Sequence, residues 1–200
     1  ANPFLYRIVQ DGEDPGDASA NLDTDGDSQL AISETLSNTI IKDRGYIIEA
    51  SDVIYVSVRF RSRLPDQFQA GALVSKGLSA LGTEFRVGGM ATENNNAPNG
   101  FLTYTSVMAT EDDTNITFED FPTGITVINH AGSTPINVNL SEGQSYMIAV
   151  ASNYGGIPND LIGSLVRSDK PIVVNSGSGT GSFASGNGGR DFGISIQTMG

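Results

Sequence analysis

The chain has 200 residues, a formal net charge of −12 at pH 7 and no cysteine. An acidic surface repels phosphate backbones and anionic head groups, which disfavours binding to nucleic acid and to membranes, and the lack of cysteine excludes disulfide frameworks, thiol catalysis and thiolate zinc sites. Hydrophobic residues make up 38% and charged residues 17%, a composition that predicts a folded chain with one large β domain or two small sandwiches in series.

Short runs rich in Val, Ile, Thr, Tyr and Phe, separated by Gly, Pro, Asn or Asp, predict strands along the chain. In chain order we expect strands at Phe4–Val9, Tyr46–Glu49, Ile54–Phe60, Phe85–Gly88, Leu102–Ala109, Asn115–Phe118, Ile125–Asn129, Ile136–Leu140, Tyr146–Ala151, Leu165–Arg167 and Ile172–Asn175. A helical turn is expected around Ser75–Leu81. In residues 54–61 apolar and polar side chains alternate, which predicts a strand of an antiparallel sheet with Ile54 on its core face.

Two segments share one pattern of glycine, strand, polar turn and second strand. Gly45–Val56 aligns with Gly163–Val174 without a gap, which predicts a duplicated hairpin, although chance similarity between two hairpins is the alternative. The polar residues Glu111–Thr114 predict a further hairpin connection between the strands on either side. The sequence therefore predicts an all-β protein, an antiparallel β-sandwich or two coupled sandwiches.

One acidic segment matches the calcium-loop pattern closely. Residues 23–34 place carboxylates at positions one, three, five and twelve of that pattern, and Ser28 replaces its glycine. The expected calcium ligands are Asp23, Asp25, Asp27, the carbonyl of Gln29, and Glu34. Because neither flank is helical, the alternatives are a stand-alone calcium loop and an acidic turn without an ion.

Catalytic motifs are scarce. His130 is the single histidine, and its place between a predicted strand and Ala131 indicates a turn residue. A serine triad would depend on His130 alone, and neither a G-x-S-x-G elbow nor an H-E-x-x-H motif is present. We therefore expect no catalytic residues, although 23 acidic residues leave a carboxylate pair for glycoside cleavage open.

Polar, glycine-rich segments indicate loops and domain boundaries. We divide the chain into an acidic segment, residues 1–38, with a strand and the calcium-like loop, and a β domain, residues 39–200, that we expect to continue beyond Gly200. Glu93–Gly100 and Ser176–Arg190 are the loops expected to contact sugars, proteins or a neighbouring module. No apolar run is long enough to span a membrane, so no membrane insertion is expected.

Three motifs resemble those of a known family, and their order and spacing also agree with it. They are Ser75–Gly88 (SKGLSALGTEFRVG), Val107–Phe118 (VMATEDDTNITF) and Asp160–Gly177 (DLIGSLVRSDKPIVVNSG). Together they resemble the N-terminal domain of the IgGFc-binding protein, in the form found in very large surface proteins of gliding bacteria of the Bacteroidota type. The resemblance covers about residue 39 to the C-terminus and carries over no catalytic residues.

The resemblance implies a function. It implies a secreted, non-catalytic module of a large cell-surface protein, exported by the type IX route, that serves adhesion and gliding motility by surface contact. The expected partner is a surface glycan, a protein ligand or a neighbouring module of the same long protein. The alternatives are a structural, filament-forming spacer and a carbohydrate-active enzyme or carbohydrate-binding module.

Overall fold

A computed structural model describes residues 36–42, 48, 50–61, 70–74, 77–89, 102–131, 135–151 and 161–178. The strands are β1 (Thr39–Ile41), β2 (Ser57–Arg61), β3 (Ala70–Val74), β4 (Gly82–Arg86), β5 (Leu102–Ala109), β6 (Thr114–Glu119), β7 (Ile136–Leu140), β8 (Ser145–Ala151) and β9 (Leu165–Ser178). All of their pairings are antiparallel. One 3₁₀ turn, η3 (Gly77–Ala80), lies inside the segment expected to be helical. The all-β antiparallel prediction is confirmed.

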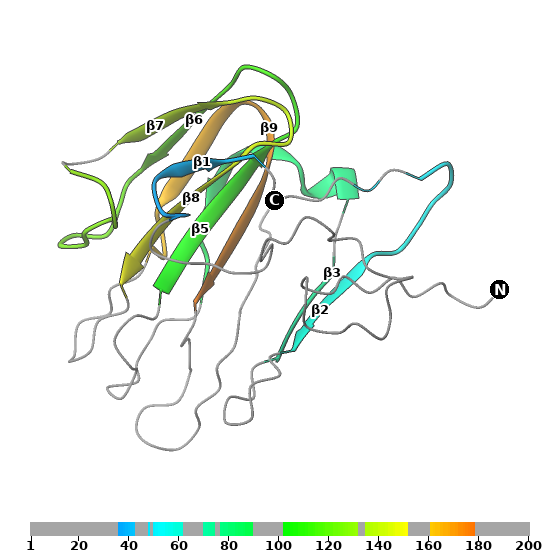
Figure 1. The fold of residues 1–200 in the computed structure, drawn as a ribbon, viewed down its shortest axis with the longest axis horizontal. Helices are drawn as coiled ribbons and strands as arrows, with labels where there is room; N and C mark the ends of the chain where they lie inside the picture. Colours follow the sequence, from blue (N-terminus) through cyan, green and yellow to red (C-terminus); the bar gives the residue numbers. More distant parts are fainter. Residues whose placement is uncertain are drawn as a thin grey trace.

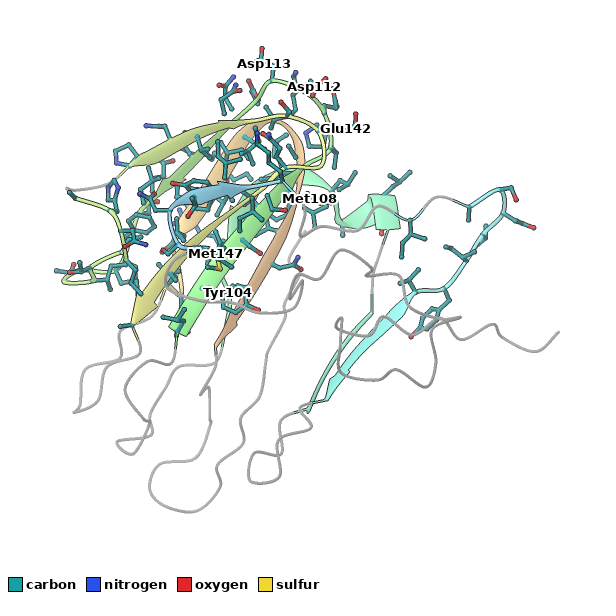
Figure 2. The ribbon with its side chains drawn as sticks, viewed as in Figure 1. Tyr104, Met108, Asp112, Asp113, Glu142 and Met147 are labelled. Atoms are coloured by element: carbon teal, nitrogen blue, oxygen red, sulfur yellow. The ribbon has the colours of Figure 1, made fainter. Side chains whose placement is uncertain are left out.

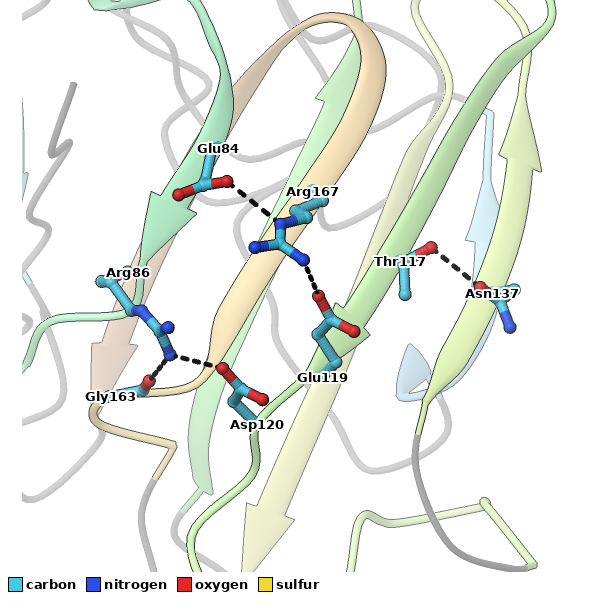
Figure 3. Close-up of polar contacts among 8 residues, drawn as sticks. All are labelled: Glu84, Arg86, Thr117, Glu119, Asp120, Asn137, Gly163 and Arg167. Atoms are coloured by element: carbon cyan, nitrogen blue, oxygen red, sulfur yellow. Dashed lines mark hydrogen bonds and ion pairs between the residues drawn. The ribbon is translucent and has the colours of Figure 1, made fainter.

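Seven strands form one sheet that folds into two layers (Figure 1). The strand order is β1-β8-β5-β9-β6-β7, and β4 also pairs with β9. The first half of β9, residues 165–168, pairs with β6, whereas the second half, residues 172–178, pairs with β5. β4 pairs with residues 165–167 and, through Gly82, with Ile172. β9 bends between these halves and therefore belongs to both layers (Figure 3). The sheet is nearly closed, and this arrangement is compatible with a sandwich.

The bend in β9 lies beside a turn that joins β5 to β6. Both carboxylate oxygens of Asp169 accept hydrogen bonds from Asn115, from its backbone N–H at 2.8 Å and from its side-chain amide at 2.7 Å. Nearby, the Thr110 hydroxyl donates to the Pro171 carbonyl at 2.6 Å. These contacts satisfy polar groups at the corner, where the regular ladder is interrupted.

Two predicted hairpins are therefore wrong. β5 and β6 do not pair with each other; each pairs with β9, so residues 111–114 connect two layers and are not a hairpin turn. Likewise, Gly163–Val174 is not a hairpin, because residues 165–178 form one continuous strand whose halves pair with different neighbours. Its proposed counterpart, Gly45–Val56, lies partly outside the described residues, and its described part contains no strand.

The main core fills the space between the layers. In β6 the side chains of Ile116 and Phe118 point inward and are 1% and 0% exposed, while Asn115 is exposed. The ring of Phe118 lies 5.9 Å from that of Tyr146 on β8, in the other layer. Burying each large apolar side chain stabilises the fold by about 1.5–3 kcal/mol, so this core is the main source of stability.

A buried serine fastens the start of the described chain to the sheet. The Ser37 hydroxyl accepts a hydrogen bond from the Ala149 N–H of β8 and donates one to the Ile128 carbonyl, both at 3.0 Å. The next side chain, Asn38, donates to the Asn129 carbonyl at 2.8 Å and accepts from the Tyr146 hydroxyl. These bonds complete the edge of β8 beyond the short strand β1.

Other strand predictions differ from the structure in instructive ways. The expected strand Ile125–Asn129 is wrong: this segment is irregular, with a single bridge at Val127 and a left-handed Asn129 at φ 59°. The strand expected from Ile54 begins at Ser57, and Ile54 is 53% exposed, so its assignment to a core face is wrong. Phe4–Val9 lies outside the described residues, and the division at residue 38 stays a prediction.

Candidate binding surfaces

Most residues predicted to form sites lie outside the described part of the chain. This applies to the calcium-like loop, residues 23–34, and to Glu93–Gly100, and only the first three residues of Ser176–Arg190 are described. His130 is described, and its N–H donates to the Val127 carbonyl at 3.3 Å, which closes a turn. Its Nε2 atom is buried without a hydrogen-bond partner. The structure thus places His130 in a turn, as expected.

The outer face of β4, β9 and β6 carries ion pairs (Figure 3). Arg167 Nε contacts Glu84 at 3.0 Å, and its Nη1 contacts Glu119 at 2.8 Å. Arg86 Nη1 contacts Asp120 and also donates to the Gly163 carbonyl, each at 2.9 Å. Hydrogen bonding to Glu84 is the main cause that raises the pKa of Arg167. The carboxylates on this face are thus neutralised by arginine side chains, and the face is polar and solvated.

Among the described residues, the buried polar side chains are serines and threonines, and none is a carboxylate. In the same ranges, no cluster of three or more His, Cys, Asp or Glu side chains has the geometry to hold a metal ion. The described carboxylates therefore act as surface charges and as hydrogen-bond acceptors that hold turns.

One end of the sheet, which we call the acidic tip, consists of turns 110–113 and 141–144 and the β9 bend (Figure 2). The Glu142 N–H donates to Asp112 Oδ1 at 3.1 Å, and the Asn139 amide donates to Asp113 Oδ1 at 2.8 Å. The hydrogen bonds from Asn115, first from its side chain, lower the pKa of Asp169. The tip is thus an ordered, polar set of turns.

The other end of the sheet is where three neighbouring strands start or stop. Leu102, the first residue of β5, lies opposite Ala151, the last residue of β8, and Thr103 lies opposite Ser178, the last residue of β9. The segments before residue 102 and after residues 151 and 178 therefore attach side by side. Both loops named from the sequence attach here, and we call this the loop end.

A second apolar cluster lies on the outer face of β5 and β8. It contains Leu102, Tyr104, Met147 and Ala149, with Leu36 and Ile128 packed against it. Burial raises the pKa of Tyr104. This cluster was not predicted from the sequence. The continuous apolar run 146–151 was a usable signal, because a strand that is covered on both faces loses the alternation of a half-buried strand.

A comparison with known protein families identifies the family of this chain. A family model described as IgGFc binding protein matches residues 71–196, which is more than half of the chain. The chain belongs to the IgGFc-binding protein family. No curated protein and no solved structure matches it. Membership of this family of binding domains indicates a non-catalytic binding or adhesion module of the kind typical of extracellular proteins. Within the described residues, no helix is long and apolar enough to cross a membrane.

Proposed function

We propose that the chain is an adhesion module of a large secreted bacterial surface protein and that it acts in surface attachment and gliding motility. Two findings support this proposal. The family is one of binding domains, and the sheet carries its neighbouring loops on a firm two-layered core. Export by the type IX route and a place on the bacterial cell surface are part of the proposal.

The observation that best supports the loop end as the binding surface is the pairing of Leu102 with Ala151 and of Thr103 with Ser178. Strands fixed side by side hold the segments attached to them at one end, so these segments can contact a single partner together. Binding residues concentrate on loops carried by a rigid scaffold in many β-sandwiches. The proposed partner is a surface glycan, a protein ligand or a neighbouring module.

A bead-attachment assay tests this proposal. Beads coated with the purified chain are brought onto glass and glycan-coated surfaces, and the force or flow that detaches them is measured. One variant replaces residues 93–100 by a Gly-Ser segment of equal length. The matched control, Asp112→Asn with Asp113→Asn, changes the acidic tip at the opposite end of β5. We expect the loop variant to lose at least tenfold in attachment with an unchanged melting temperature, and the tip variant to attach normally.

Two outcomes would count against the proposal. Equal attachment by all three proteins would show that the loop end does not bind the surface. Loss of attachment in the tip variant alone would place the contact at the acidic tip. A structural spacer, the alternative role, would leave coated beads no more adhesive than beads coated with an unrelated acidic protein.

A further inference from the structure

The sequence contains two N-x-S/T tripeptides, the acceptor motif for N-linked glycans in exported proteins. They are Asn115-Ile116-Thr117 on β6 and Asn139-Leu140-Ser141, which begins on β7. No other asparagine of the 200 residues has serine or threonine at the second position after it. An exported chain passes the transferases that recognise this motif, and the family is one typical of extracellular proteins.

The structure brings the two asparagines of these motifs side by side on an exposed face. In the pairing of β6 with β7, Asn115 lies directly opposite Asn139, and both residues are exposed. Thr117, the hydroxyl residue of the first motif, lies on the same face of β6, and its hydroxyl donates to Asn137 Oδ1 at 2.8 Å (Figure 3). A sugar on either asparagine would therefore extend into solvent beside the acidic tip and not into the core.

The hydrogen bonds of the two side-chain amides distinguish the two positions. Asn139 Nδ2 donates to Asp113 Oδ1 at 2.8 Å and to Asn115 Oδ1 at 3.0 Å, so its two hydrogens have two acceptors. Asn115 Nδ2 donates to Asp169 Oδ2 at 2.7 Å, and its Oδ1 is the acceptor for Asn139. Within the described part of the chain, Asn115 therefore keeps one amide hydrogen that makes no hydrogen bond.

N-glycosylation consumes one amide hydrogen. In the transfer, Nδ2 forms a bond to the anomeric carbon of an oligosaccharide, the bond from that carbon to the diphosphate of a lipid carrier breaks, and one Nδ2 proton is released together with the lipid diphosphate. The product is a secondary amide with one N–H and an unchanged carbonyl oxygen. At Asn115 this product retains the bond to Asp169 and the acceptor for Asn139, whereas at Asn139 it loses one of its two hydrogen bonds.

We propose that Asn115 is an N-glycan acceptor, used in preference to Asn139, and that the sugar donor is an oligosaccharide carried on a lipid diphosphate. This inference rests on export of the chain, which is part of the proposed function. Transfer precedes the end of folding, so the folded and secreted pool retains the product that the native hydrogen bonds accommodate. The glycan stands beside the acidic tip, at the opposite end of the sheet from the loop end, and leaves the loop end open for attachment.

Peptide mapping by mass spectrometry tests the proposal on the full chain, secreted from a host that N-glycosylates exported proteins. The digest is compared before and after treatment with an amidase that removes N-glycans and converts the linked asparagine to aspartate. We expect occupancy of Asn115 to exceed that of Asn139 at least about threefold, the factor that one lost hydrogen bond produces. Thr117→Ala destroys the first motif, and Ser141→Ala, the matched control, destroys the second, while both asparagines stay in place. The glycan should be lost in Thr117→Ala and kept in Ser141→Ala.

An unmodified Asn115 in the secreted wild type would overturn the assignment, as would equal occupancy of both asparagines or a glycan that persists in Thr117→Ala. The same mapping of the protein purified from its natural source should find the glycan on Asn115, and an unmodified residue there would also overturn it. Urea unfolding of each variant shows whether the sheet is intact, so a loss of glycan through misfolding is recognised. A chain that carries the glycan but does not hold beads to a surface would support this site and refute attachment, so the two proposals fail separately.

Discussion

Gly177 lies against the ring of Tyr104, and this contact allows a quantitative prediction. A Cβ atom at position 177 would meet Tyr104 Oη at 2.7 Å, Cζ at 2.8 Å and Cε1 at 2.9 Å. All three distances are shorter than real Cβ contacts, and the ring is buried in the second apolar cluster. Overpacking costs about 1–3 kcal/mol, and replacing glycine by alanine returns about 0.4–1 kcal/mol through the unfolded chain. Gly177→Ala is therefore expected to destabilise the fold by roughly 1 kcal/mol, and by about 2.6 kcal/mol at most.

Urea unfolding followed by far-UV circular dichroism measures this change. Gly89→Ala is the matched control, because its nearest neighbour would be Ile162 Cγ1 at 3.7 Å, an ordinary contact, and we expect it to be neutral or slightly stabilising. In a double-mutant cycle, Tyr104→Leu removes the opposing ring atoms and should abolish most of the cost of Gly177→Ala. Equal effects at positions 177 and 89, or a cost that persists beside Tyr104→Leu, would refute the reasoning.

Three further predictions concern single side chains. Ser37→Ala should cost about 1–3 kcal/mol in urea unfolding, because it leaves the buried Ala149 N–H and the partly buried Ile128 carbonyl without their partner. The exposed variant Thr83→Ala should cost less than about 0.5 kcal/mol, and equal costs would contradict the role of Ser37. Hydrogen bonds lower the pKa of Asp169 in the folded state, so wild type should be more stable than Asp169→Asn by a constant amount near neutral pH. This difference in unfolding free energy should vanish as the pH falls below the ordinary pKa of 3.8, and a difference that persists in acid would argue against the role of Asp169. Calcium should raise the melting temperature and a chelator should lower it, because calcium at a hundredfold excess over Kd would stabilise the folded state by about 2.7 kcal/mol. Asp25→Ala should remove this effect, and a response retained in that variant would count against the calcium loop.

The local sequence pattern predicted several strands with nearly correct bounds. Leu102–Ala109 and Ile136–Leu140 were predicted with the bounds that β5 and β7 have, and Asn115–Phe118 differs from β6 by one residue at each end. These segments lie between polar turns and have enough β-branched and aromatic residues to determine their state locally. In contrast, β3 was missed, because AGALV has few strand-forming residues and is held by its pairing with β2.

The two wrongly predicted hairpins are errors about which strands pair with each other. Strand pairing depends on contacts between residues that are distant in sequence. Residues 163–174 and 107–118 both have a polar interruption between two apolar runs, the pattern of a hairpin. In the structure the two interruptions lie beside each other, and Asp169 binds Asn115 across them. Each interruption is thus the place where the chain crosses from one layer to the other, within β9 in one case and between β5 and β6 in the other. A single-segment pattern cannot distinguish a hairpin from such a corner, because both need polar residues where the ladder stops.

The corner also determines how the two ends of the domain can evolve. At the acidic tip, the turn before β6 and the bend in β9 are tied together by side-chain hydrogen bonds, so a length change there would disturb contacts between the layers. At the loop end, by contrast, the connections of β5, β8 and β9 begin after regular pairing with Ala151 and Ser178 has ended. Insertions and substitutions in connections that leave a sheet at its end are generally tolerated with little effect on the core. A family that keeps one scaffold while changing its partner should therefore vary at the loop end, and attachment that transfers with these segments alone, when they are grafted between family members, is the expected result.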